Sequence, residues 1–414
     1  MNIESYKKCS SAISLQGREK SVRKSSIRAL SDADIFKAKI YNHLSKADKA
    51  DFIQQWQELD DEAINAAESI QKLFYYYMFF LRAEKGDRNT STPGIRKYYS
   101  QENFTKLYDS RVMDDLKAIL NLWVVTNNRV GLEDEEWSND IGILKTLDTL
   151  ASYPNEFWKY PVVIYYLKYR EDMDFSSKFS TFLHRLLAIL SARYIVTPTI
   201  NAVKSGILNL NAEIIKSDSP KFEFNPIDEL ELKQKIKTAH KNTVRMILKE
   251  LAYQHQDRLL PEKWEIEHIL PQKWQDTYFP GVGANEVREL VEHIGNKIPF
   301  EKKLNITASN GYFQKKRNSY DKSEVEILRT LSEGNSDWGL DEIRERDLRI
   351  ADELVDLLNG WGLNGTDEQY NHLTPIPEER FNDYQAFVTM FKLPDDNDSR
   401  EQFLQMGQQG QSGN

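Results

Sequence analysis

One histidine stands among residue types that could hydrolyse a phosphodiester bond. His268 directly follows Glu267, and Asn296 and Asn305 come later in the chain. A neutral imidazole can accept a proton near pH 7, because its ordinary pKa is about 6.5. Carboxylate and amide oxygens suit one Mg²⁺ or Mn²⁺ ion far better than zinc. We therefore expect His268 to activate water, and Glu267 and Asn305 to hold a divalent cation beside a phosphate.

The spacing of these residues leaves the ligand set open. Adjacent residues of a strand point to opposite faces, so Glu267 and His268 share a site only if the chain bends near Pro271. On alternation grounds, Glu265 is the competing carboxylate. Asn310 is the alternative amide ligand, because Asn305 could simply cap a helix. We expect Asn296 to hold the loop while a backbone carbonyl fixes the tautomer of the histidine.

Positive charge gathers around the second half of this motif. Between Asn296 and Lys322 there are seven basic residues and only two acidic ones, although the chain as a whole carries a net charge of −9. We expect Lys315, Lys316 and Arg317 to contact DNA phosphates rather than bases. The alternative is a solvated helix face, which is the commoner use of such a run.

Short elements must position this site. Residues 265–270 and 294–300 read as two strands separated by a long loop that is punctuated by Pro and Gly. A helix is expected from about 309 to 318, a capping box at 323–326 opens another, and 341–360 continues helically.

The first 250 residues have the apolar spacing of helices. Ser31 is the expected N-cap of a helix whose apolar pattern runs from Ile35 to Trp56, and a second helix is expected over 63–84. Further helices are predicted at 102–125, 138–152, 155–170, 176–195 and 228–252. Residues 87–94 read as a loop, and 218–226 as a linker.

These elements predict a mainly α protein, in which an all-α N-terminal domain precedes a small α+β nuclease domain. The expected organisation is a flexible leader over 1–30, a helical domain over 31–245, a ββα-metal domain over 246–350, a helical cover over 351–394 and a disordered tail over 395–414.

The motif resembles the HNH, or His-Me finger, pattern, and it is similar to the HNH domain of RNA-guided CRISPR nucleases. The likeness to the C-terminal half of GmrSD-type restriction endonucleases is closer and covers roughly residues 246–350. It is carried by His268-Ile269-Leu270-Pro271-Gln272, Ile294-Gly295-Asn296, Asn305, Ser309-Asn310, Phe313, Lys315, Tyr320, Trp338, Ile343 and Arg346.

This resemblance implies a metal-dependent endonuclease that cuts DNA, most simply double-stranded DNA, in a restriction-like anti-phage defence system. In the family, an Asp-Gly-Gln-Gln-Arg string marks a nucleotide-sensing half, and that string is not found in this sequence. We expect either a nucleotide-binding partner subunit that supplies this half, or a truncated form. The alternative functions are an RNA-cleaving toxin and a non-catalytic subunit that recruits a partner.

Composition bounds the remaining possibilities. A single cysteine, Cys9, excludes an internal disulfide and any zinc site built on cysteine pairs. The longest apolar run, Leu73 to Leu81, is too short to span a bilayer, and the first residues lack an apolar signal core. We therefore expect a cytoplasmic protein that does not enter membranes.

Overall fold

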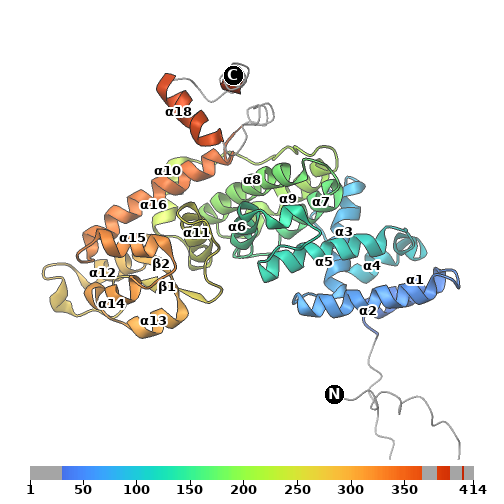
Figure 1. The fold of residues 1–414 in the computed structure, drawn as a ribbon, viewed down its shortest axis with the longest axis horizontal. Helices are drawn as coiled ribbons and strands as arrows, with labels where there is room; N and C mark the ends of the chain where they lie inside the picture. Colours follow the sequence, from blue (N-terminus) through green and yellow to red (C-terminus); the bar gives the residue numbers. More distant parts are fainter. Residues whose placement is uncertain (1–29, 366–379, 392–402, 405–414) are drawn as a thin grey trace, which may run out of the picture.

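The chain was analysed as a computed structural model that describes residues 30–365, 380–391 and 403–404. Helices dominate these residues, and the one sheet among them has two strands, which confirms the mainly α prediction. Figure 1 shows an elongated arrangement, with helices α1 and α2 near one end and the two strands near the other. The expected leader over 1–30 and tail over 395–414 lie almost wholly outside the described residues.

The N-terminal part of the structure contains nine α-helices. They are α1 (Asp32–His43), α2 (Lys49–Asn65), α3 (Ile70–Glu84), α4 (Ile95–Tyr99), α5 (Val112–Asn128), α6 (Ile141–Leu150), α7 (Lys159–Tyr169), α8 (Phe175–Val196) and α9 (Asn201–Ile214). Ser31 caps α1 as predicted, and Asp34 completes a capping box with it.

Four of the predicted helices differ from the structure. The helix expected over 102–125 begins at Val112, and the one expected over 228–252 is two helices, Glu229–Lys237 and Lys241–Gln254. The pattern from Ile35 to Trp56 is split between α1 and α2, because Leu44 is extended and residues 45–48 form a turn. The second helix begins at Ile70 rather than at residue 63, because the side chain of Ser69 accepts a hydrogen bond from the backbone N–H of Lys72 and caps it there.

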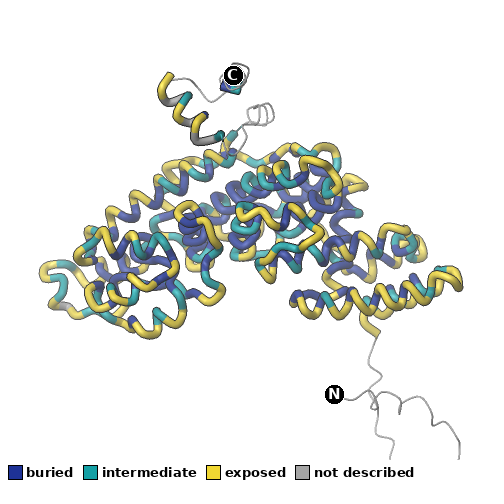
Figure 2. Tube along the Cα trace, in the orientation of Figure 1, coloured by how far each residue is buried: buried dark blue, intermediate teal, exposed yellow. Residues whose placement is uncertain are grey.

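The core of the helical part is continuous with that of the C-terminal part. Buried apolar side chains form one cluster that extends from Phe36 to Leu363. Figure 2 shows that the helices at the middle of the molecule carry most of the buried positions. Helix α8 is long and apolar enough to cross a membrane, but 72% of its most apolar window is buried in the protein. Helix α8 is thus a core helix by its packing.

The C-terminal part places a small sheet among short helices. Its elements are α10 (Glu229–Lys237), α11 (Lys241–Gln254), β1 (Trp264–His268), α12 (Ala284–Val291), β2 (Lys297–Glu301), α13 (Lys302–Ala308), α14 (Phe313–Tyr320), α15 (Glu326–Gly334) and α16 (Leu340–Gly360), followed by α18 (Phe381–Phe391). Strands β1 and β2 are antiparallel, and His268 at the end of β1 pairs with Lys297 at the start of β2.

This part differs from the prediction in three ways. The long loop between the strands contains α12, and the helix expected near 309–318 begins at Phe313 as α14, preceded by α13, which was not predicted. The borders expected after residues 245 and 350 fall inside α11 and α16. A continuous helix transmits packing along its whole length, so α11 and α16 join the parts that those borders would separate.

Candidate functional site

Asn296 fastens the loop that follows His268. Its side-chain oxygen accepts hydrogen bonds from the backbone N–H of Leu270 at 2.7 Å and from the indole N–H of Trp338 at 3.3 Å. Its amide nitrogen donates to the carbonyl oxygens of Leu270 and Val291, both at 2.9 Å. Asn296 is fully buried, and each polar group of its side chain has a partner. The loop-holding role expected for Asn296 therefore agrees with its contacts.

Helix α16 fixes the turn that carries Asn296. The Arg346 guanidinium donates to the carbonyl oxygens of Gly295 at 2.7 Å and Lys297 at 2.8 Å. The Asp347 carboxylate accepts from the backbone N–H of Gly295 at 2.7 Å and contacts His293 Nδ1 at 2.6 Å. A Cβ atom on Gly295 would lie 2.3 Å from a backbone oxygen of α16, so this close approach requires glycine.

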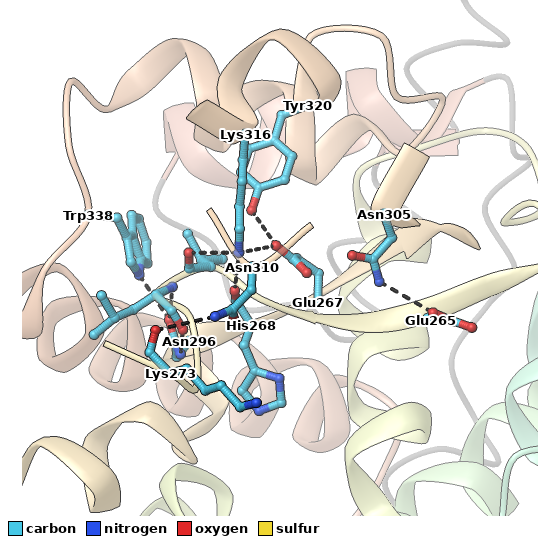
Figure 3. Close-up of polar contacts among 12 residues, drawn as sticks. Glu265, Glu267, His268, Lys273, Asn296, Asn305, Asn310, Lys316, Tyr320 and Trp338 are labelled. Carbon is cyan, nitrogen blue, oxygen red and sulfur yellow. Dashed lines mark hydrogen bonds and ion pairs between the residues drawn. The ribbon is translucent and has the colours of Figure 1, made fainter. Parts of the chain in front are cut away.

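Glu267 is held in a buried ion pair. Its carboxylate lies 2.5 Å from the ammonium of Lys316 and accepts a hydrogen bond from the Tyr320 hydroxyl at 2.7 Å. The ammonium of Lys316 also donates to the backbone oxygen of His268 at 2.7 Å. The side chains of Lys316 and Glu267 are only 1% and 7% exposed. Figure 3 shows this group on the side of β1 away from the His268 ring.

The position of Lys316 contradicts its expected contact with DNA phosphate. An ammonium that is buried and paired with a carboxylate cannot reach a solvent-borne phosphate without breaking that pair. The pKa of Lys316 is lowered by burial, which the neighbouring Glu267 partly opposes. Lys315 is exposed and Arg317 is half-buried, so both remain candidates for phosphate contact.

Asn305 lies beside Glu265 rather than Glu267. Its side-chain amide donates to the carboxylate of Glu265 at 3.4 Å. Figure 3 shows the two side chains facing each other. Lys302 contacts the other oxygen of that carboxylate at 3.3 Å, and both side chains are about half exposed. Asn305 lies inside α13 and does not cap it. Asn310 is exposed and its amide donates to the carbonyl oxygen of Lys273 at 3.3 Å.

His268 faces a different set of polar groups. Its Nε2 atom lies 3.4 Å from the Glu292 carboxylate and 3.4 Å from the Gln272 amide nitrogen. The Gln272 amide donates to the other oxygen of Glu292 at 2.8 Å, and the Lys297 ammonium lies 3.1 Å from Glu292. The imidazole keeps 19% of its surface exposed, so small molecules in solvent can reach it.

Burial sets the protonation of this imidazole. It lowers the pKa of His268 below 6.5, although the Glu292 carboxylate acts in the opposite direction. His268 is therefore mostly neutral at pH 7 and can accept a proton. Burial alone would raise the pKa of Glu292, but hydrogen bonds from Gln272 and Lys297 lower it to about 2. Glu292 is ionised throughout the physiological range.

The structure thus brings together part of the predicted site. Asn296 positions the loop after His268, whereas Glu267, Glu265 and Asn305 make no contact with the imidazole among the interactions of the described residues. No cluster of three His, Cys, Asp or Glu side chains that could hold a metal occurs in the described part of the chain.

Sequence reasoning missed the residues that surround His268. Gln272 was part of the motif without a role, Lys297 was counted only as charge, and Glu292 follows a helix that was expected to be loop. The buried positions of α12, which are Val287, Leu290 and Val291, have the i, i+3, i+4 spacing of an amphipathic helix. That spacing could have located Glu292 at the end of a helix.

The comparison with protein families identifies this part of the chain. Residues 225–353 match the family described as GmrSD restriction endonucleases, C-terminal domain. This segment is therefore a C-terminal domain of the GmrSD type, as the motif suggested, and this match supports an endonuclease. The match begins just before α10 and ends within α16, so it includes the whole environment of His268. No curated protein matches the chain.

Proposed function

We propose that the protein is a metal-dependent, HNH-type endonuclease that hydrolyses DNA phosphodiesters, as a subunit of a restriction-like defence system. The observation that carries this proposal is the neutral, partly exposed His268, held at the end of β1 next to a loop fastened by Asn296. Endonucleases of the restriction class take DNA as substrate, and the matched segment contains this histidine.

The side chains near β1 differ in how well they suit a divalent cation. Glu265 and Asn305 offer oxygen atoms that solvent can reach, leaving room for the water ligands that Mg²⁺ retains. Glu267 suits a cation poorly, because the ammonium of Lys316 would repel the cation and the carboxylate would have to leave a buried pair. Of these side chains, Glu265 and Asn305 therefore suit Mg²⁺ or Mn²⁺ better than Glu267 does, although alternation along β1 places Glu265 on the face opposite His268.

When bound, such a cation stabilises negative charge on the phosphate and the leaving oxygen. The remaining steps belong to the chain. His268 takes a proton from a water molecule as that water attacks phosphorus and the bond from phosphorus to the leaving 3′-oxygen breaks; the leaving oxygen then takes a proton from solvent. Asn296 and α16 keep the backbone around the imidazole fixed while the charge develops. Lys315 and Arg317 would contact the phosphate backbone on either side.

The first experiment is a plasmid-nicking assay with Mg²⁺ or Mn²⁺. We expect His268→Ala to lower the nicking rate by about a hundredfold or more, because a general base contributes on that order. His255→Ala is a matched control, because His255 pairs with Glu353 on an exposed surface that lies outside this site. A His268→Ala protein that cuts at the parental rate would overturn the assignment of the base.

The same assay separates the cation ligands and the substrate class. We expect Glu265→Gln and Asn305→Ala each to raise the Mn²⁺ concentration needed for half-maximal cutting. Parallel digestion of plasmid and total RNA distinguishes a DNA enzyme from an RNA-cleaving toxin. Adding nucleotide, with and without a candidate nucleotide-binding subunit, tests whether the chain acts with a partner. Absence of cutting in every condition would favour the non-catalytic, partner-recruiting role.

A further inference from the structure

Three groups next to His268 converge on one carboxylate. The Gln272 amide approaches Glu292 at 2.8 Å, the Lys297 ammonium at 3.1 Å and the His268 imidazole at 3.4 Å. These groups come from the loop after β1, the start of β2 and the end of β1, and the carboxylate comes from the residue that ends α12. A carboxylate bound in this way marks a place where the fold accepts an anion.

The Lys297 and Glu292 side chains differ in how freely they can move. The Lys297 side chain is 8% exposed and also donates to the backbone oxygen of Glu292 at 2.5 Å, so its ammonium is fixed. The Glu292 side chain is 55% exposed and can turn towards solvent. Because more than half of the Glu292 side chain faces solvent, water screens its contacts, and another anion that offers the same oxygen acceptors can replace it.

We propose that Gln272 and Lys297 form a phosphate-binding subsite beside His268, and that Glu292 occupies this subsite in the free protein. The proposal rests on the proposed nuclease function and names two further substrate-positioning residues for it. A DNA phosphate carries the same charge as the carboxylate and offers oxygen acceptors to the same two donors. Entry of the phosphate releases Glu292 and places the phosphodiester next to the imidazole.

An open hollow lies beside this contact and leaves room for the DNA backbone. It measures about 390 Å³ and is lined by Lys241, Glu289, Glu292, His293, Lys297 and the turn at 238–239. Lys241 and Lys297 supply positive charge, while Glu289 and Glu292 oppose it. Turning Glu292 out of the subsite would leave a net positive lysine pair facing the phosphate path.

A different role for Glu292 would be to orient the imidazole. The distances favour the subsite, because the carboxylate lies closer to Gln272 and Lys297 than to His268. The two roles predict opposite effects of removing the charge. An orienting carboxylate would lower activity when it is lost, whereas an occupying carboxylate would increase DNA binding when it is lost.

The test measures binding of a short labelled DNA duplex by fluorescence anisotropy in EDTA, so that no cutting takes place. We expect Glu292→Gln to bind about threefold to tenfold more tightly than the parent, a range that matches one weak ion pair. Glu286→Gln is the matched control, because Glu286 lies on the same helix, α12, outside the lining of the hollow, and its substitution changes the net charge equally. We expect that control to change binding by less than about twofold.

Lys297→Met completes a double-mutant cycle with Glu292→Gln, because methionine keeps the buried aliphatic part of the side chain and removes the ammonium. We expect it to weaken binding on its own and to abolish the gain of Glu292→Gln in the double variant. An equal gain in both glutamate variants would overturn the proposal, as would weaker binding by Glu292→Gln. Because the readout is binding without metal, these failures are distinct from a failure of His268→Ala in the nicking assay.

Discussion

At the scale of single residues, the site depends on how each polar group finds a partner. The sequence pattern predicted that Asn296 would hold a loop. In the structure its side chain donates two hydrogen bonds to carbonyl oxygens and accepts two from N–H groups. The analysis of the pattern missed that Lys316 turns inward to Glu267. The spacing of Phe313, Lys316 and Tyr320, which is i, i+3, i+7, places Lys316 on the apolar face of α14 and could have shown it.

Replacing Asn296 with Ala tests the fastening of the loop. The substitution leaves the Leu270 N–H, the Trp338 indole N–H and two carbonyl groups without their partner in a buried place. We expect a loss of about 3 kcal/mol or more in the free energy of unfolding, measured by urea denaturation. A loss below about 0.5 kcal/mol would mean that the hydrogen bonds of Asn296 add little to the stability of the fold.

Lys316→Met and Lys315→Met form a matched pair. Loss of the Lys316 ammonium leaves the Glu267 carboxylate buried without a counter-charge, so we expect a destabilisation of about 3 to 5 kcal/mol. The exposed Lys315 should change stability by less than about 0.5 kcal/mol while weakening DNA binding. Thermal unfolding and anisotropy measure the two effects. If Lys315→Met were the more destabilising change, the inward position of Lys316 would be contradicted.

At the scale of elements, helix α11 packs against β2, and helix α16 packs against the turn that carries Asn296. Helix α11 leads into β1 and carries Lys249, which pairs with Asp148 of α6 at 2.9 Å. It also carries Glu250, whose one carboxylate oxygen accepts a hydrogen bond from Ser191 of α8 at 2.5 Å. The second oxygen of Glu250 has no hydrogen-bond partner in the described part of the chain. This carboxyl lies at the junction between α8 and α11.

The Glu250 carboxyl makes stability depend on pH. Burial raises its pKa from 4.5 to about 8, partly opposed by the Ser191 hydroxyl. Because the folded-state pKa is raised, the stabilising contribution is complete below about pH 4.5 and is lost as the pH rises through about 8. Between these values, the loss approaches about 1.4 kcal/mol per pH unit.

We expect Glu250→Gln to remove this dependence, because an amide does not titrate. The melting temperature of the variant should fall less than that of the parent when the pH is raised from 5 to 9. Differential scanning calorimetry at several pH values gives the comparison. Parallel curves for the two proteins would show that Glu250 does not titrate in the folded state in this range.

At the scale of the whole molecule, the sequence predicts the class of fold, but it does not predict how the N-terminal and C-terminal parts pack together. The apolar spacing predicted most of the helices, but α9 was missed because Gly206 and several asparagines interrupt its pattern. The structure explains that glycine, since a Cβ atom there would lie 2.2 Å from the Phe224 ring. The domain borders could not be predicted, because packing across α11 and α16 is invisible to local periodicity.

The continuous core predicts cooperative unfolding of the two parts. Arg129 of the helical part contacts Asp148 at 3.0 Å and donates to the carbonyl oxygen of Leu260, just before β1, at 2.6 Å. We expect Val163→Ala in α7 to lower hydrogen-exchange protection in β1 and β2 as well as in α7, by about 1 kcal/mol. Loss of protection in α7 alone would mean that the parts unfold separately.

The most direct test of the account is chemical rescue of His268→Gly in the nicking assay with Mn²⁺. If the imidazole is the group that takes the proton from water, the variant should be nearly inactive, and added imidazole should restore part of the nicking. The same imidazole should not increase the rate of the parent or of Asn305→Ala. A glycine variant that cuts at the parental rate without imidazole would contradict the assignment of His268 as the general base.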